Sequence, residues 1–170
     1  EQARMNRTPD SPRPAAVRIS SAPEHLAGLS PLLEAARSAV GDVPALLELA
    51  KAAEEAAPKP GEGRTAFLWE VLASVTAVDV AAGRAIEPHL DASAILAQAA
   101  GHAALAGWDC PDFDGVHFDG AWGVFAAEAA GLRLEAKPAD GCFVLQGSKP
   151  WCSLAAQLDH AVVTAHLDDG

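Results

Sequence analysis

Residues 122–147, WGVFAAEAAGLRLEAKPADGCFVLQG, decide the fold class of this 170-residue chain. In the middle of the stretch the side chains alternate between apolar and polar, with Leu132, Leu134 and Ala136 on one side, which is the period of a β-strand. Asp140-Gly141 is a strong signal for a hairpin turn, so the next residues should return as a second strand. Further predicted strands cover residues 122–129, 142–147 and 160–167.

Before this stretch the apolar residues recur every three or four positions, which is the period of a helix. The predicted helices cover residues 24–40, 43–57, 65–85 and 88–107. Gly41-Asp42 and the Pro- and Gly-rich residues 58–63 separate the first three, Thr65 is expected to cap the third, and Pro88 is expected to open the fourth. Helices followed by strands predict an α+β fold and argue against an alternating βαβ sheet.

The same patterns divide the chain into three parts. Residues 1–22 contain several Pro, Arg and Ser residues and predict a disordered leader, and residues 23–118 predict an all-α domain. Residues 119–170 predict the beginning of an antiparallel β-domain, in which three or four strands have no closing partner. Because folded proteins usually cover an exposed sheet edge, we expect the chain to be the front part of a longer protein, or a half that meets another chain.

Composition limits the partners and the location. A net charge of −11 argues against binding to nucleic acid, and no apolar run reaches the roughly 20 residues needed to insert into a membrane. The three cysteines, Cys110, Cys142 and Cys152, form neither a CxxC pair nor a disulfide framework, so we expect no metal site and a cytoplasmic protein.

Four candidate sites have plainer structural explanations. Ser153 and His160 are too loosely spaced to define a hydrolytic pair. His89 and His102 could share a helix face, but no HExxH pattern accompanies them, so structural or exposed histidines are expected. The segment GEGR at residues 61–64 could hold an anion before a helix, but it has neither a preceding strand nor a P-loop lysine.

The fourth is Glu128, which follows an apolar strand. It could be a buried carboxylate with a shifted pKa, or it could cap a turn.

The segment GSKPWCS at residues 147–153 is different, because it is part of a known pattern: a strand, a glutamate turn, an Asp/Gly hairpin, a Lys-x-Trp segment and a strand of the type AVVTA. In this order the pattern resembles the acyl-CoA dehydrogenases at the start of their middle β-domain, and the resemblance covers about residues 24–170.

The resemblance implies an FAD-dependent enzyme that dehydrogenates an acyl thioester between its α- and β-carbons. By matching position, Trp151 would cover the flavin ring, the Ser153 hydroxyl would lie near flavin N5 and Cys152 would offer its backbone. The main chain of Ala126 and Ala127 would lie along the pyrimidine edge of the ring. An aromatic face that excludes water and a fixed donor suit a redox ring. In the plainer structural alternative, Trp151 only fills the joint between helices and strands.

Departures from the family keep other functions open. Residues 127–131 lack the threonine of the family's turn and most of the Gly-Ala-Gly-Ser-Asp run that follows it, which puts acyl-CoA binding in doubt. The family's catalytic base lies in a C-terminal helical domain, so no residue of this chain is named catalytic. The alternatives are a flavin monooxygenase or oxidase of the same superfamily, or a non-catalytic subunit. The resemblance also implies a homo-oligomer, and the electron acceptor stays open.

Overall fold

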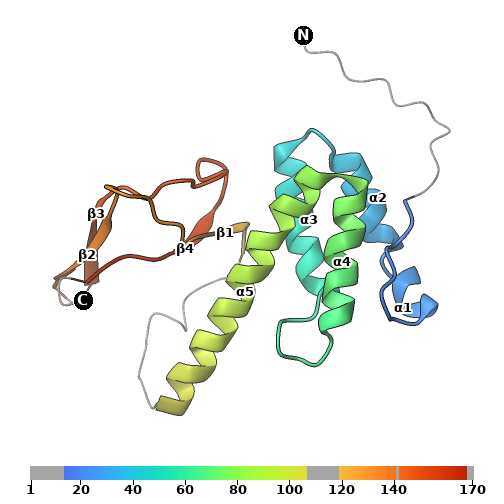
Figure 1. The fold of residues 1–170 in the computed structure, drawn as a ribbon, viewed down its shortest axis with the longest axis horizontal. Coiled ribbons are helices and arrows are strands. Elements are labelled where there is room, and N and C mark those ends of the chain that lie inside the picture. The colour runs from blue at the N-terminus through green and yellow to red at the C-terminus, as the bar shows by residue number, and fades with distance from the viewer. Residues whose placement is uncertain (1–13, 107–118, 141, 168–170) are drawn as a thin grey trace, which may run out of the picture.

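The computed structural model describes residues 14–106, 119–140 and 142–167. Within these ranges the elements are α1 (Pro23–Ala27), α2 (Ser30–Ala39), α3 (Val43–Ala56), α4 (Thr65–Val78), α5 (Val80–Ala106), β1 (Trp122–Phe125), β2 (Leu134–Ala139), β3 (Cys142–Gly147) and β4 (His160–Val163). Figure 1 shows the helices gathered on one side and the strands on the other, with α5 running between them. The predicted α+β composition, helices first and strands second, is therefore confirmed.

The core lies among the helices. Its largest members include Leu29, Leu33, Val71 and Ile86, all of which are buried. The predicted apolar stripe of the first helix is part of this core, although the helix itself is broken at Gly28, where α1 ends and α2 follows. At its start α3 is capped by Asp42, whose side chain accepts a hydrogen bond from the backbone N–H of Ala45 at 3.2 Å.

The break between the last two helices differs from the prediction. α4 ends at Val78, Asp79 is extended, and α5 continues through Pro88 to Ala106. The interruption therefore lies at Asp79 and not at Pro88. It allows α5 to fold back on α4 so closely that Gly83 approaches Thr76, where a Cβ would collide with the threonine hydroxyl. The prediction of Thr65 as a cap is also wrong, because Thr65 is the first helical residue and no side chain caps α4.

In the described ranges the strands form two pairs, and His166, just after β4, is linked to β2 by backbone hydrogen bonds with Leu134 and Ala136. β2 and β3 make the predicted antiparallel hairpin, in register from Leu134 opposite Gly147 to Ala139 opposite Cys142. β1 pairs with β4 in parallel, with Trp122 opposite His160, so the expectation of a purely antiparallel sheet is wrong for this pair. A parallel pair needs a long connection, which residues 126–159 supply, and the orientation of such distant strands leaves no trace in their periodicity.

Part of the segment before α1 packs against α4. The backbone N–H of Val17 donates to the Ser74 hydroxyl, and the buried carboxylate of Glu70 accepts three further backbone N–H groups, from Ile19, Ser20 and Ser21. The described portion of residues 1–22 is thus bound to the helices, and residues 1–13 lie outside the described residues. In the described part of the chain, no helix combines the length and the apolar character needed to cross a membrane.

Candidate functional site

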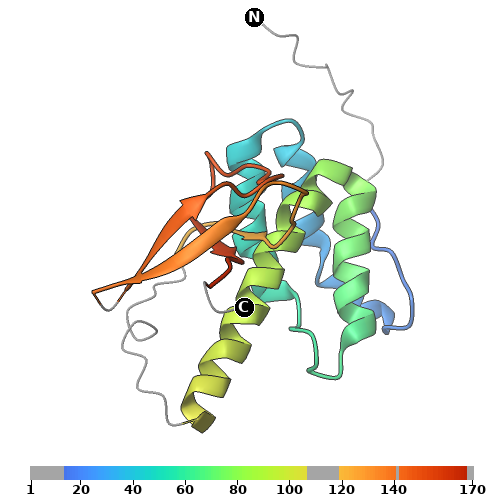
Figure 2. The same cartoon turned by 60° about the vertical axis from the view of Figure 1, so that its left-hand side comes forward.

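An apolar cavity of about 250 Å3 opens where the strands meet the helices. Its walls come from α3, α5, β1 and the loop at 151–158, with Leu46 and Leu47 on one side and Phe125 and Leu158 on the other. In Figure 2 the free end of the β2–β3 hairpin points away from the helices. Among the strands of the described chain, β1 contributes lining residues to the cavity, and the hairpin contributes none. A volume of this size is just below the ~300–1,000 Å3 usual for ligand pockets.

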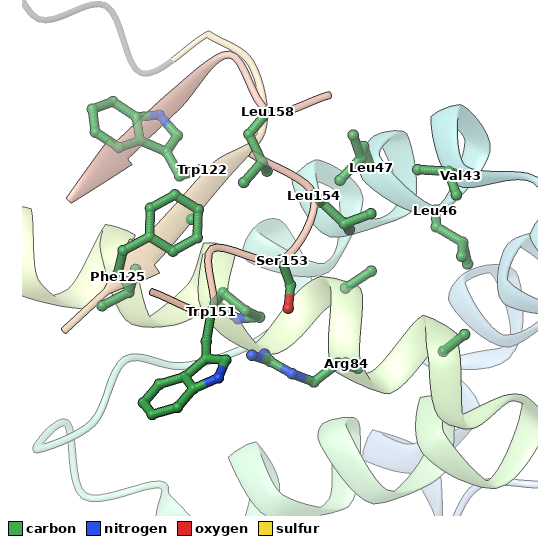
Figure 3. Close-up of a pocket in the computed structure, with 15 residues that line it drawn as sticks. Val43, Leu46, Leu47, Arg84, Trp122, Phe125, Trp151, Ser153, Leu154 and Leu158 are labelled. Atoms are coloured by element: carbon green, nitrogen blue, oxygen red, sulfur yellow. The ribbon is translucent and has the colours of Figure 1, made fainter. Parts of the chain in front are cut away.

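Two of the five residues singled out by sequence line this cavity, Trp151 and Ser153. The Trp151 side chain is 70% exposed, and in Figure 3 its indole lies at the same side of the cavity as the Arg84 guanidinium. Its backbone has φ of +56°, the left-handed region that costs a residue with a Cβ about 1–2 kcal/mol. An exposed indole in a strained backbone does not fit the alternative in which Trp151 fills a joint in the core.

The Ser153 hydroxyl is not hydrogen-bonded to any described residue, although the Ser153 backbone N–H donates to the Trp151 carbonyl at 3.0 Å. The hydroxyl is therefore available to a ligand. In Figure 3 it points to the side of the cavity where Arg84 and Trp151 lie. One aromatic face, one free hydroxyl and apolar walls are the usual ingredients of a site for a flat ring or an apolar chain.

The other three predicted residues do not line the cavity. The Cys152 thiol is half-buried and turns toward the backbone of the preceding residues, where its one hydrogen is shared between the carbonyl oxygens of Lys149 and Pro150, at 3.4 and 3.6 Å from Sγ. Ala126 and Ala127 are exposed beyond the end of β1, and the Ala126 carbonyl accepts from the Thr164 hydroxyl at 3.5 Å. The structure thus brings Trp151 and Ser153 together and leaves the alanine main chain outside.

The cavity has little charge. Arg84 is the one charged side chain among the described lining residues, and Glu87 pairs with it at 2.8 Å. No carboxylate or imidazole lines the cavity in the described part of the chain. The site can therefore bind and shield a ligand, and its own described side chains offer no proton acceptor for acid–base chemistry.

Behind the cavity wall lies a buried histidine that the sequence did not connect with the site. The Trp122 backbone N–H, on β1, donates to His89 Nδ1 at 3.2 Å, so Nδ1 must carry a lone pair. The proton is then on Nε2, which faces Glu54 Oε2 at 3.2 Å, and Glu54 in turn accepts from the Ser93 hydroxyl. Burial lowers the pKa of His89 despite the opposing effect of Glu54, which keeps the imidazole neutral.

The remaining sequence candidates do not form sites. His160 Nε2 hydrogen-bonds to the Asp119 carbonyl at 3.0 Å and its ring lies on Trp122, so no pair with Ser153 exists. The side chain of His102 lies outside the described residues, and the described residues contain no group of three or more potential metal ligands. Glu128 is exposed and pairs with His166 at 2.7 Å, so it is not a buried carboxylate.

The turn at residues 61–64 is exposed and follows a helix, as expected for a simple break between helices.

Comparisons with protein-family models, with curated protein sequences and with solved structures find no match. A flavin fits the observed residues in part. The cavity with Trp151 and Ser153 suits one flat ring system, whereas the rest of a dinucleotide would have to lie outside a space of about 250 Å3.

Proposed function

We propose that this chain is an acyl-CoA dehydrogenase-like flavin oxidoreductase. Residues 23–118 would correspond to the N-terminal helical domain of such an enzyme and residues 119–170 to the start of its middle β-domain. The observation that carries the proposal is that Trp151 and Ser153, named from the sequence motif, line one apolar cavity between helices and strands. When bound there, FAD would supply the acceptor for a hydride from the β-carbon of an acyl thioester.

Each described residue of the cavity has a simple task in this proposal. The exposed indole of Trp151 offers a flat face for the ring, and the free Ser153 hydroxyl can donate a hydrogen bond to a ring nitrogen. Leu46, Leu47 and Leu154 exclude water from the space beside the ring. The α-proton of the substrate needs a base, and the cavity's described residues do not provide one, so the base lies elsewhere in this proposal.

A second candidate, a flavin monooxygenase or oxidase of the same superfamily, is favoured by one observation. The turn after Glu128 is short and closed: the backbone N–H of Leu132 donates to the Ala129 carbonyl at 3.1 Å, and Gly131 has φ of +78°. Glu128 is also engaged with His166. Little free backbone remains there to hold a thioester, which would suit a substrate that is not a CoA ester.

The oligomer implied by the resemblance is part of the proposal. β3 exposes Phe143, Val144 and Leu145, and among the described strands it pairs with β2 alone, which provides an uncovered apolar surface. Light scattering on the purified protein tests it, and a mass equal to one chain at all concentrations would reject it.

The first test of the function is an absorbance spectrum of the purified protein, with FAD released by denaturation and quantified. One FAD per chain supports the flavin proposal, and reduction by acyl-CoA with an artificial electron acceptor then favours the dehydrogenase. Oxygen consumption without acyl-CoA turnover favours the second candidate. A colourless protein that does not take up added FAD would reject both and leave the non-catalytic subunit.

A further inference from the structure

One imidazole joins the cavity wall formed by β1 to α5. β1 is a short strand whose pairing in the described chain is with β4, which is itself largely exposed. The hydrogen bond from the Trp122 N–H to His89 Nδ1 joins this strand to α5, and the neighbouring Pro88 lines the cavity directly. Trp122, Gly123, Val124 and Phe125 all contribute to the cavity. A shift of β1 would therefore change the shape of the cavity along one entire side.

The imidazole is itself fixed from its other end. Its Nε2–H donates to Glu54 on α3, and Ser93 on α5 holds the second oxygen of the same carboxylate. His89 is 2% exposed, so neither ring nitrogen can exchange its partner for water without movement of the surrounding chain. The network thus ties α3, α5 and β1 together through a single tautomer of one ring.

Protonation of this ring would remove the connection to β1. A proton on Nδ1 would face the Trp122 N–H, and two donors cannot share a hydrogen bond. The bond to Glu54 would survive and become an ion pair, so the ring would stay with α3 while β1 lost its hydrogen bond to α5 and kept its pairing with β4. Protonation would therefore distinguish two states, one in which β1 is hydrogen-bonded to α5 and one in which that hydrogen bond is absent.

We infer that His89 is a positioning residue that holds β1, and with it the ligand-binding shape of the cavity, only while its imidazole is neutral. This inference depends on the proposed function only for the identity of the ligand. Loss of binding should occur below the ordinary histidine range, because burial lowers the pKa of His89. Above that range the imidazole is neutral and binding should be independent of pH.

Other charged groups near this junction have to be separated from His89. Lys51 and Glu54 face the imidazole from α3. On the side of the strands, the His160 ring lies 4.6 Å from the Trp122 ring, and Asp159 accepts from the Ala121 N–H at 2.8 Å. His160 is the group most easily confused with His89, so each variant below is also made together with His160→Gln.

Two amide substitutions distinguish the bond to β1 from a general packing role. In His89→Asn the carbonyl oxygen can take the place of Nδ1 and accept from Trp122, whereas in His89→Gln the amide nitrogen lies nearer the place of Nε2 and serves Glu54. Both amides are neutral and neither titrates. The readouts are the protection of the Trp122 amide against hydrogen exchange and the Kd for FAD per folded molecule. Both are followed through the ordinary histidine range, from about pH 8 to about pH 5, and further into acid for as long as the protein remains folded.

At pH 8 we expect His89→Asn to protect the Trp122 amide as the wild type does. In His89→Gln, exchange should be faster and the Kd for FAD higher, each by roughly ten-fold, the effect of losing one buried hydrogen bond. On acidification, only the proteins that retain His89 should lose protection of the Trp122 amide and affinity for FAD, whether or not they also carry His160→Gln.

Equal protection in the two amide variants, or a wild-type Trp122 amide that does not respond to acid while the protein remains folded, would overturn the inference. The exchange measurement needs no ligand. If the wild type fails to bind FAD at any pH, the proposed function fails, and the response of the Trp122 amide still decides the role of His89. If FAD binds but its Kd follows only the thermal stability of each variant, His89 is a packing residue and not a positioning one.

Discussion

The Glu70 carboxylate accepts a hydrogen bond from the backbone N–H of Ile19 at 2.6 Å, across 51 positions of the sequence. The same oxygen accepts from Ser20 and Ser21, so one side chain of α4 organises the turn that leads into α1. Burial alone would raise the pKa of Glu70, but the Ser21 hydroxyl and the three backbone N–H groups outweigh it and lower the pKa to about 2.

Glu70→Gln should lower the Tm by on the order of 5 °C. The amide keeps an acceptor but loses the negative charge that strengthens the three hydrogen bonds, and it places two new donors in a buried site. Glu62→Gln is the matched control, because Glu62 accepts a single exposed backbone hydrogen bond from Lys59. Thermal unfolding followed by circular dichroism would measure both, and equal Tm values for the two variants would contradict the anchoring role of Glu70.

The same carboxylate predicts the direction of an acid transition. Its pKa in the folded protein, about 2, lies below the ordinary value of 4.5, so the unfolded chain binds the proton more tightly. The stabilisation is complete above pH 4.5 and is lost as the pH falls from 4.5 toward about 2. Denaturant unfolding at several pH values should therefore show a steeper acid loss in the wild type than in Glu70→Gln. Parallel pH profiles would mean that Glu70 has an ordinary pKa.

Gly147 at the end of β3 is expected to tolerate no side chain. Its φ is +113°, and a Cβ would collide with the carbonyl oxygen of Arg133. Gly147→Ala should destabilise the β2–β3 hairpin by on the order of 2 kcal/mol, measured by hydrogen exchange of its amides. Gly101→Ala is the control in α5, where the space is open and alanine should stabilise the helix by roughly 0.5–1 kcal/mol. Unchanged exchange in Gly147→Ala would mean that the hairpin can shift register.

Local periodicity was enough to predict the type of most elements. Leu32, Leu33 and Ala36 repeat at helical spacing and are buried in the core, and Asp140 lies in the predicted turn with φ of +41°. The features that periodicity did not predict depend on contacts between residues far apart in the sequence. The parallel pairing of β1 with β4 is a relation between strands on either side of the hairpin, and the break at Asp79 serves the close approach of Gly83 to Thr76.

The candidate site divides in the same way. Trp151 and Ser153 are close in the sequence, so a short motif could name both as neighbours, and both line the cavity. The sequence shows that position 89 is a histidine but not which groups it contacts. Its two hydrogen bonds go to Glu54 and to the backbone of Trp122, each more than thirty positions away in the sequence. A backbone donor has no signature in the sequence, so the link between α5 and β1 required the structure.

Trp151 offers the sharpest separation of binding from folding. Its indole is 70% exposed and its φ is +56°, so glycine would relieve backbone strain while removing few contacts. Relief of about 1–2 kcal/mol is offset in part by the greater freedom of glycine in the unfolded chain, so Trp151→Gly should leave the free energy of unfolding unchanged or raise it by up to about 1 kcal/mol. FAD affinity should fall by about 1–3 kcal/mol in both Trp151→Gly and Trp151→Ala.

Comparing Trp151→Gly with Trp151→Ala shows whether the strained backbone of Trp151 serves ligand binding or the stability of the fold. Trp151→Ala retains the unfavourable φ, so it should be less stable than Trp151→Gly although both lack the ring. Urea unfolding measures the stability difference and fluorescence titration with FAD measures the affinity. If both variants unfold more easily than the wild type and retain their FAD affinity, the indole supports the fold. A strained, exposed tryptophan that costs stability and is needed only for binding is one whose conformation serves the site and not the fold.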